Sequence, residues 1–147
     1  MKPFVRNTII LFGLIVVDQL LKVWIESTRF FTDIGIVSIH YVSNTGASFG
    51  MLQGNNVLLA WVSVIVLGVI MLNADKIKKE QELPVVLIVA GLLGNLIDRV
   101  FRGFVVDFVD FKFWPVFNLA DSLIVIGVIW LLVVILRKDY LESKKKR

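Results

Sequence analysis

The chain has 147 residues, of which 57% are hydrophobic, and its mean hydropathy is +0.82. Typical soluble domains are about 45–50% apolar on a count that includes Gly, so the composition indicates a membrane protein, which we expect to form one domain over residues 1–147. With no Cys and a single His, the chain excludes disulfides, thiol catalysis, zinc–thiolate sites and multi-His metal sites.

Four apolar blocks are long enough to be predicted as membrane-spanning helices, since a span needs about 20 mostly apolar residues. They cover roughly residues 8–25, 56–72, 84–100 and 118–136. The first block is too long for a cleavable signal peptide and lacks an A-x-A-like end, so we expect it to stay as a signal anchor. Pro84 suits the first turn of the third helix.

The two longer loops carry structure of their own in this interpretation. The stretch GIVSIHYVSNTGASFG, within loop 26–55, begins with β-branched and aromatic residues and then turns glycine-rich, which predicts one or two short strands and a turn. The stretch GFVVDFVDFKFWPVF, around loop 101–117, mixes aromatics with acids, as expected at a membrane interface. The predicted fold class is an all-α membrane protein, a four-transmembrane-helix bundle with a small partly β extracytoplasmic platform.

The basic residues predict the orientation. Eleven of the sixteen Lys and Arg residues lie in segments 1–6, 73–83 and 137–147. By the positive-inside rule these segments are cytoplasmic, and the two longer loops lie outside. The basic tail 137–147 is expected to rest on anionic lipid, so the net charge of +4 does not call for a nucleic-acid partner.

Two similar tetrapeptides stand at the edges of the last two spans. They are Asn95-Leu-Ile-Asp98 and Asn118-Leu-Ala-Asp121, and the predicted topology places both acids just below the outer surface. Ionisable groups in a span cost about 2.5–3.5 kcal/mol and point to function. Of two neighbouring carboxylates, one keeps its proton where the other has lost it. Asp98 and Asp121 are therefore predicted to activate a water as an aspartic-protease pair does.

Structural roles compete with this hypothesis. Asp121 is also explained as a first-turn acid behind Asn118 as N-cap, and Asp98 as the partner of Arg99 in a local ion pair. Asp18 and Lys22 have the spacing of a favourable helical pair. The alignment of Asp18, Asp98 and Asp121 at one depth favours a site.

Other polar residues are expected to have minor roles. His40 is interpreted as a polar strand residue, and Asp107 and Asp110 as residues that orient the outer loop, so that Asp107→Asn should keep substantial activity. A Ser–Lys pair that uses Lys22 remains open for three serines, Ser43, Ser48 and Ser122.

Five motifs in order resemble lipoprotein signal peptidase, also called signal peptidase II. They are D18-Q-L-L-K22, N44-T-G-A-S-F-G50, G94-N-L-I-D-R99, G103-F-V-V-D-F108 and F117-N-L-A-D-S122. The resemblance covers nearly the whole chain. The chain departs from the family at Ser48, where Ala is frequent, and at Val89–Leu93, where a Gly-Gly-Ala run is frequent.

The resemblance implies an aspartyl endopeptidase of the bacterial cytoplasmic membrane, with four spans, both termini cytoplasmic and an outward-facing site. Such enzymes remove the signal peptide from prolipoproteins whose lipobox cysteine carries a diacylglyceryl group, cutting just before that cysteine. The implied partners are this substrate and membrane lipids; we expect a monomer with no metal or cofactor. Carried over by position, the site residues are Asp98 and Asp121 as catalysts, Asn44, Gly46, Asn95, Arg99 and Asn118 as substrate-binding or site-shaping residues, and Asp18 and Lys22 as supports. Gly50 matches the same glycine-containing loop as Gly46.

Two other classes are weighed against the enzyme. A transporter or proton-conducting subunit would spread acids through the membrane depth, whereas Asp18, Asp98 and Asp121 gather toward one side. A non-catalytic assembly subunit predicts that Asp→Asn changes harm folding more than activity.

Overall fold

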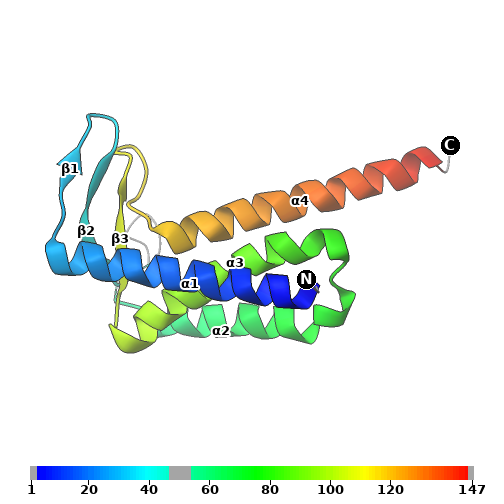
Figure 1. Cartoon of the computed structure of the whole chain (residues 1–147), viewed down its shortest axis with the longest axis horizontal. Helices are drawn as coiled ribbons and strands as arrows, with labels where there is room; N and C mark the ends of the chain where they lie inside the picture. Colours follow the sequence, from blue (N-terminus) through cyan, green and yellow to red (C-terminus); the bar gives the residue numbers. More distant parts are fainter. Residues whose placement is uncertain (1–2, 47–53, 146–147) are drawn as a thin grey trace.

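The computed structural model describes residues 3–46 and 54–145. The long helices are α1 (Pro3–Thr28), α2 (Asn56–Leu72), α3 (Glu82–Phe101) and α4 (Leu119–Lys145), and the strands are β1 (Thr32–Asp33), β2 (Ser38–Asn44) and β3 (Val105–Asp110). Two short 3₁₀ helices, η2 (Ala74–Lys76) and η3 (Lys79–Gln81), connect α2 to α3. Figure 1 shows the strands standing at one end of the helices, with the N-terminus near the other end and the C-terminus beyond it.

The predicted membrane protein, mostly helical with a small sheet, is confirmed. Within the described residues, three helical segments are long and apolar enough to cross a bilayer: Pro3–Thr28, Lys79–Phe101 and Leu119–Lys138. The helix α2 is apolar but has 17 residues, about 26 Å at 1.5 Å per residue, so it lies at the lower limit for a span. Each predicted block begins within five residues of the observed helix of that region, and α1 and α3 extend beyond their blocks at both ends.

The end of α4 differs from the prediction. The span was expected to finish near residue 136 and to release a separate basic tail, but the helix continues to Lys145. The sequence RKDYLESKK contains good helix formers and neither Gly nor Pro, so nothing in it ends the helix. Figure 1 shows this end of α4 projecting beyond the other helices.

The helix α3 holds the bundle together. It contacts α1, α2 and α4, whereas α2 has α3 as its one neighbour among the four long helices. Close approach depends on small residues: a Cβ placed on Gly94 would lie 2.7 Å from Asp18 Oδ2 and 3.2 Å from Ala120 Cβ. Gly94 therefore allows α1 and α4 to meet against the same turn of α3.

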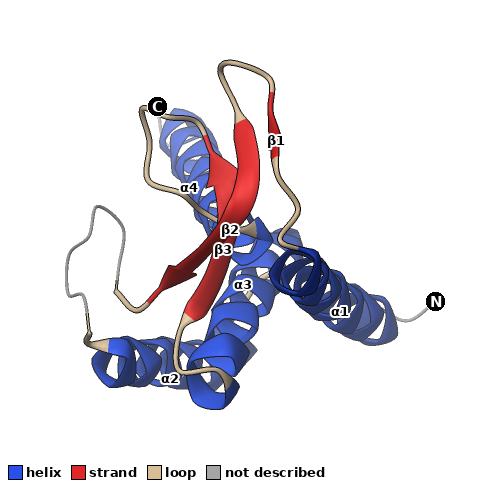
Figure 2. Cartoon of the chain, turned by 90° about the vertical axis from the view of Figure 1, so that its left-hand side faces the viewer, coloured by secondary structure: helices blue, strands red, loops and turns tan. Residues whose placement is uncertain are grey.

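The predicted partly β platform is present as a three-stranded antiparallel sheet with the order β1-β2-β3. Figure 2 shows the strands lying across the ends of the helices. The strand β3 has both faces covered, because side chains alternate between faces along a strand. On one face Val106 and Phe108 pack with Ile25 of α1, which turns Val105 and Asp107 to the opposite face.

Candidate active site

The first turn of α4 is built by a reciprocal pair of side chains. Asn118 Oδ1 accepts the backbone N–H of Asp121 at 2.9 Å, and Asp121 Oδ2 accepts the backbone N–H of Asn118 at 3.1 Å. This is the geometry of a capping box with an Asp at its third position. The interpretation of Asn118 as N-cap is confirmed, and the cap fixes the direction of the Asp121 carboxylate.

Asp107 of β3 faces the same region from the sheet. Its Oδ1 accepts Asn118 Nδ2 at 2.7 Å, and its Oδ2 accepts Asn44 Nδ2 at 2.8 Å. Val42 pairs with Asp107, so Asn44, two residues further along β2, lies on the same face of the sheet. The carboxyl of Asp107 is buried; this burial first, and the nearby charge of Asp121 second, raise its pKa to about 7.

A polar cavity of about 180 Å³ is lined by these two carboxylates and by residues of α2 and α3. Asp107, Asp121, Asn44, Asn95 and Arg99 line it with Gly46, Ser63, Leu92, Val105, Val116 and Ile124. Among the described residues, the buried Arg99 Nε has no hydrogen-bond partner. The cavity thus combines two acids, two amides and a guanidinium N–H group with spare donor capacity.

Asp98, predicted as the partner of Asp121, lies elsewhere. It is fully buried and does not line the polar cavity. Its Oδ2 forms a 2.9 Å ion pair with Lys22 and accepts the backbone N–H of Val106 at 3.2 Å. Its Oδ1 accepts Gln19 Nε2 at 3.2 Å and forms an ion pair with Arg102.

The structure therefore corrects the predicted geometry: Asp107, and not Asp98, shares a cavity with Asp121. Successive helical residues are rotated by about 100°, so Arg99 faces the cavity while Asp98 faces α1. The suggested local pair of Asp98 with Arg99 is also wrong, since its cationic partners are Lys22 and Arg102.

The cluster around Asp98 joins α1 to α3. The predicted helical pair of Asp18 with Lys22 is confirmed, with Nζ and Oδ2 2.9 Å apart. Two members were missed: Gln19 donates to Asp98 and to the carbonyl of Gly94, and Arg102 also pairs with Glu26. The spacing of Arg102, four residues after Asp98, was the available signal.

Asn95 connects this cluster to the cavity. Its Oδ1 accepts Lys22 Nζ at 3.0 Å and Asn118 Nδ2 at 3.1 Å, and its Nδ2 donates to Asp121 Oδ1 at 2.8 Å. Of the predicted site residues, Asn44, Gly46, Asn95, Arg99 and Asp121 therefore line one cavity, and Asn118 lies behind them, hydrogen-bonded to Asn95 and Asp121. Gly46 donates its backbone N–H to Asn44 Oδ1 at 2.9 Å, which holds that side chain.

The Ser–Lys hypothesis finds no contact among the described residues. Lys22 Nζ contacts Asp18, Asp98 and Asn95, whereas Ser122 Oγ donates to the carbonyl of Asn118. Ser43 is exposed, and His40 contacts Ser38 on the sheet at 3.4 Å. Ser48 and Gly50 lie outside the described residues.

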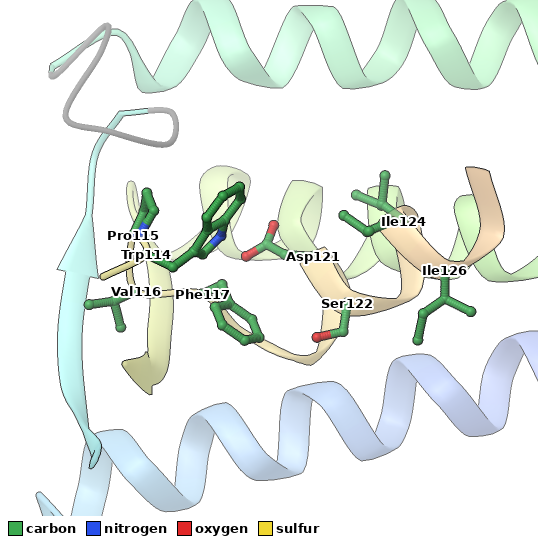
Figure 3. Close-up of a pocket in the computed structure, with 9 residues that line it drawn as sticks. Trp114, Pro115, Val116, Phe117, Asp121, Ser122, Ile124 and Ile126 are labelled. Atoms are coloured by element: carbon green, nitrogen blue, oxygen red, sulfur yellow. The ribbon is translucent and has the colours of Figure 1, made fainter. Parts of the chain in front are cut away.

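A second cavity, of about 460 Å³, adjoins the first. It is mostly apolar, with Trp114, Pro115 and Phe117 on one side and Val125 and Ile126 of α4 on the other. Val116, Asp121 and Ile124 line both cavities. Figure 3 shows the Asp121 carboxylate and Trp114 on the same side of α4, with Ser122 pointing away from them. Asp121 thus stands between a polar and an apolar space.

Comparison with known proteins gives consistent matches. The family model described as signal peptidase (SPase) II matches residues 10–137. Relatives described as lipoprotein signal peptidase include that of Clostridioides difficile, 39% identical over 97% of this chain and 99% of its own length. That of Geobacter sulfurreducens is 41% identical over 95% of this chain and 97% of its own length.

Two solved structures have the same fold. Each is described as a bacterial membrane enzyme structure by the in meso method, at 2.3 Å and 1.9 Å resolution. The first is 29% identical, with a TM-score of 0.84 over 91% of this chain and 89% of its own. The second is 30% identical, with a TM-score of 0.77 over 89% of this chain and 92% of its own.

Proposed function

This chain belongs to the signal peptidase II family of bacterial membrane peptidases, and we propose that it removes the signal peptide from diacylglyceryl-modified prolipoproteins. In this proposal it is an aspartyl endopeptidase that cuts just before the lipidated cysteine. The observation that carries the proposal is the pair of carboxylates, Asp107 and Asp121, on one polar cavity. Asn118 hydrogen-bonds to both of them, which holds the pair in a fixed relation.

The two acids have different roles in the proposed reaction. Asp107, whose pKa is raised to about 7, carries the proton, and Asp121 is the ionised general base. Asp121 takes a proton from a water, whose oxygen attacks the scissile carbonyl carbon. Asp107 donates a hydrogen bond to the developing oxyanion, and the proton that Asp121 took from the water passes to the leaving amine as the peptide bond breaks, which leaves Asp121 ionised again.

Arg99 supports substrate binding in this scheme. Its buried Nε lacks a partner among the described residues, and an unsatisfied buried donor costs about 1–3 kcal/mol. A substrate carbonyl entering the cavity would satisfy it. Arg99 is thus assigned to hold the peptide chain beside the carboxylate pair.

The proposed orientation places both termini in the cytoplasm and the sheet outside, following the distribution of Lys and Arg. The signal-peptide helix enters from the bilayer between α2 and α4, which do not contact one another. The apolar cavity opens along α4, where Val125 and Ile126 are exposed. Membrane lipids are the remaining partners, and the proposed unit is a monomer.

Purified protein should cleave a diacylglyceryl-modified prolipoprotein, with mass spectrometry of the product locating the cut before the modified cysteine. The same precursor without the lipid should be cleaved much more slowly. Wild-type protein that leaves the modified precursor intact would exclude the proposed activity. Equal rates on both precursors would show that the diacylglyceryl group is not required, while the proposed peptidase activity would stand.

The rate is expected to fall as the pH rises through about 7. Burial and the charge of Asp121 raise the pKa of Asp107 to about 7, so Asp107 is protonated below this pH and loses its proton above it. The reaction as proposed needs that proton on the oxyanion side. The check is kcat/KM measured from about pH 5 to about pH 9, because its pH dependence reports the groups of the free enzyme. A kcat/KM that rises through pH 7 and remains high would contradict the assignment of the proton to Asp107.

A further inference from the structure

The buried ammonium group of Lys22 is connected to the proposed catalytic pair through one intervening side chain, that of Asn95. Lys22 is fully buried, and its Nζ contacts Asp18 Oδ2 at 2.9 Å, Asp98 Oδ2 at 2.9 Å and Asn95 Oδ1 at 3.0 Å. An ammonium group has three N–H donors and no acceptor, so these contacts use all of them. Two of these N–H groups donate to the carboxylates of Asp18 and Asp98, and the third donates to Asn95, which lines the polar cavity.

The contact with Lys22 decides how the amide of Asn95 is turned. Because the lysine can only donate, the amide oxygen must face it, and the NH₂ group must face the other way. That NH₂ group donates to Asp121 Oδ1 at 2.8 Å. In the reversed orientation, N–H groups would meet the ammonium and a carbonyl oxygen would meet the carboxylate. Both contacts of the reversed amide are repulsive.

The orientation of Asn95 also determines the contacts of the second carboxylate, that of Asp107. With its oxygen turned inward, Asn95 also accepts Asn118 Nδ2 at 3.1 Å. Asn118 Nδ2 gives its other N–H to Asp107 Oδ1 at 2.7 Å, and Asn118 Oδ1 accepts the backbone N–H of Asp121. One charge therefore fixes the orientation of two amides, and each amide presents N–H to a different member of the pair.

We propose that Lys22 is a positioning residue, which acts on the carboxylate pair through the amide of Asn95. The proposal rests on the proposed function. Lys22 touches neither Asp107 nor Asp121 in these contacts, and its effect is to keep both facing donors rather than carbonyl oxygens. The competing role for Lys22 is purely structural: to neutralise Asp18 and Asp98 and to hold α1 against α3.

A double-mutant cycle on kcat separates these roles. The variants are Lys22→Met, Asn95→Ala and the two together, with kcat expressed per folded molecule. Lys22→Met should lower kcat by about 10- to 100-fold, the size seen when the outer hydrogen-bond partners of metal ligands are removed. In the Asn95→Ala background the same change should lower kcat by less than about threefold, because the residue through which Lys22 acts is already missing.

Asn7→Ala is the matched control for attachment of α1 to α3. Asn7 Nδ2 donates to Glu82 Oε2 at 2.6 Å, at the start of both helices and at the opposite end from the sheet (Figure 1). This variant should lower the thermal midpoint and leave kcat per folded molecule unchanged. If Lys22→Met does not fold, the cycle is run in the Asp18→Asn background, where one of the carboxylates that Lys22 neutralises is already absent.

The outcomes are distinct. If the effects of Lys22→Met and Asn95→Ala multiply, or if Lys22→Met loses stability but keeps kcat, Lys22 is structural and the proposal is overturned. Partial recovery of kcat in Lys22→Arg, which retains a donor-only cation, supports positioning. A wild-type protein that cleaves no prolipoprotein would instead overturn the proposed function.

Discussion

The Asp107→Asn variant is expected to be folded and to have a kcat about 10²–10⁴-fold below that of wild type, the usual contribution of a group that handles protons. An amide cannot supply the proton that the oxyanion needs. The loss of charge should cost little stability, because the pKa of Asp107 is raised to about 7 and its carboxyl is therefore largely neutral below that pH. The new amide N–H group would face the donor of Asn44 or Asn118, so the thermal midpoint should fall, but by less than for Asp98→Asn. The measurement is cleavage of the diacylglyceryl-modified precursor, with the thermal midpoint as the check on folding.

Asp110→Asn is the matched control on the same strand. Asp110 lies on β3 and accepts the backbone N–H of Lys112 at 2.6 Å, away from the polar cavity. This variant should keep wild-type kcat. Should the Asp107→Asn protein cleave as fast as the Asp110→Asn protein, Asp107 is not part of the catalytic pair.

The Asp98→Asn variant is expected to lose stability rather than catalytic activity. Asp98 balances Lys22 inside the bundle and Arg102 at its edge, and removing one partner of a buried ion pair costs about 3–5 kcal/mol. An Asn side chain would also turn N–H groups toward one of these donors. The folded yield and the thermal midpoint should drop, while kcat per folded molecule should change much less than in the Asp107→Asn variant.

This expectation is the opposite of the one drawn from the sequence, and it is tested by comparing the three isosteric variants at Asp98, Asp107 and Asp121. The thermal midpoint should be lowest for Asp98→Asn, whereas kcat should be lowest for Asp107→Asn and Asp121→Asn. A stable Asp98→Asn protein with no activity would restore Asp98 as a catalytic residue.

Local pairs were predictable because the chain itself brings them together. Asn118 and Asp121 are three residues apart, and Asp18 and Lys22 four, so the cap and the helical pair follow from helix geometry alone. The four apolar blocks and the strand-forming outer loop followed from composition in the same way.

The partner of Asp121 was not predictable by the same means. Membrane depth groups Asp98 with Asp121, but depth is one coordinate, and the rotation of α3 turns Asp98 toward Lys22. For Asp107, the stretch VVDF has apolar residues on both faces of its strand, so the alternation that would reveal its direction is hidden. Packing of Val106 against Ile25 decides that direction, and this contact joins residues far apart in the chain.

The capping box at the start of α4 has a consequence for how the enzyme loses activity. The N-cap Asn118 contacts both carboxylates, and Asp121 is itself the third residue of the box. Fraying of this single turn would therefore dismantle the pair while the rest of the bundle stays intact. Local opening is easiest where few contacts are buried, but Asn118 and Ala120 are fully buried. We therefore expect this turn to open only when α4 separates from α3, so that thermal inactivation and global melting coincide.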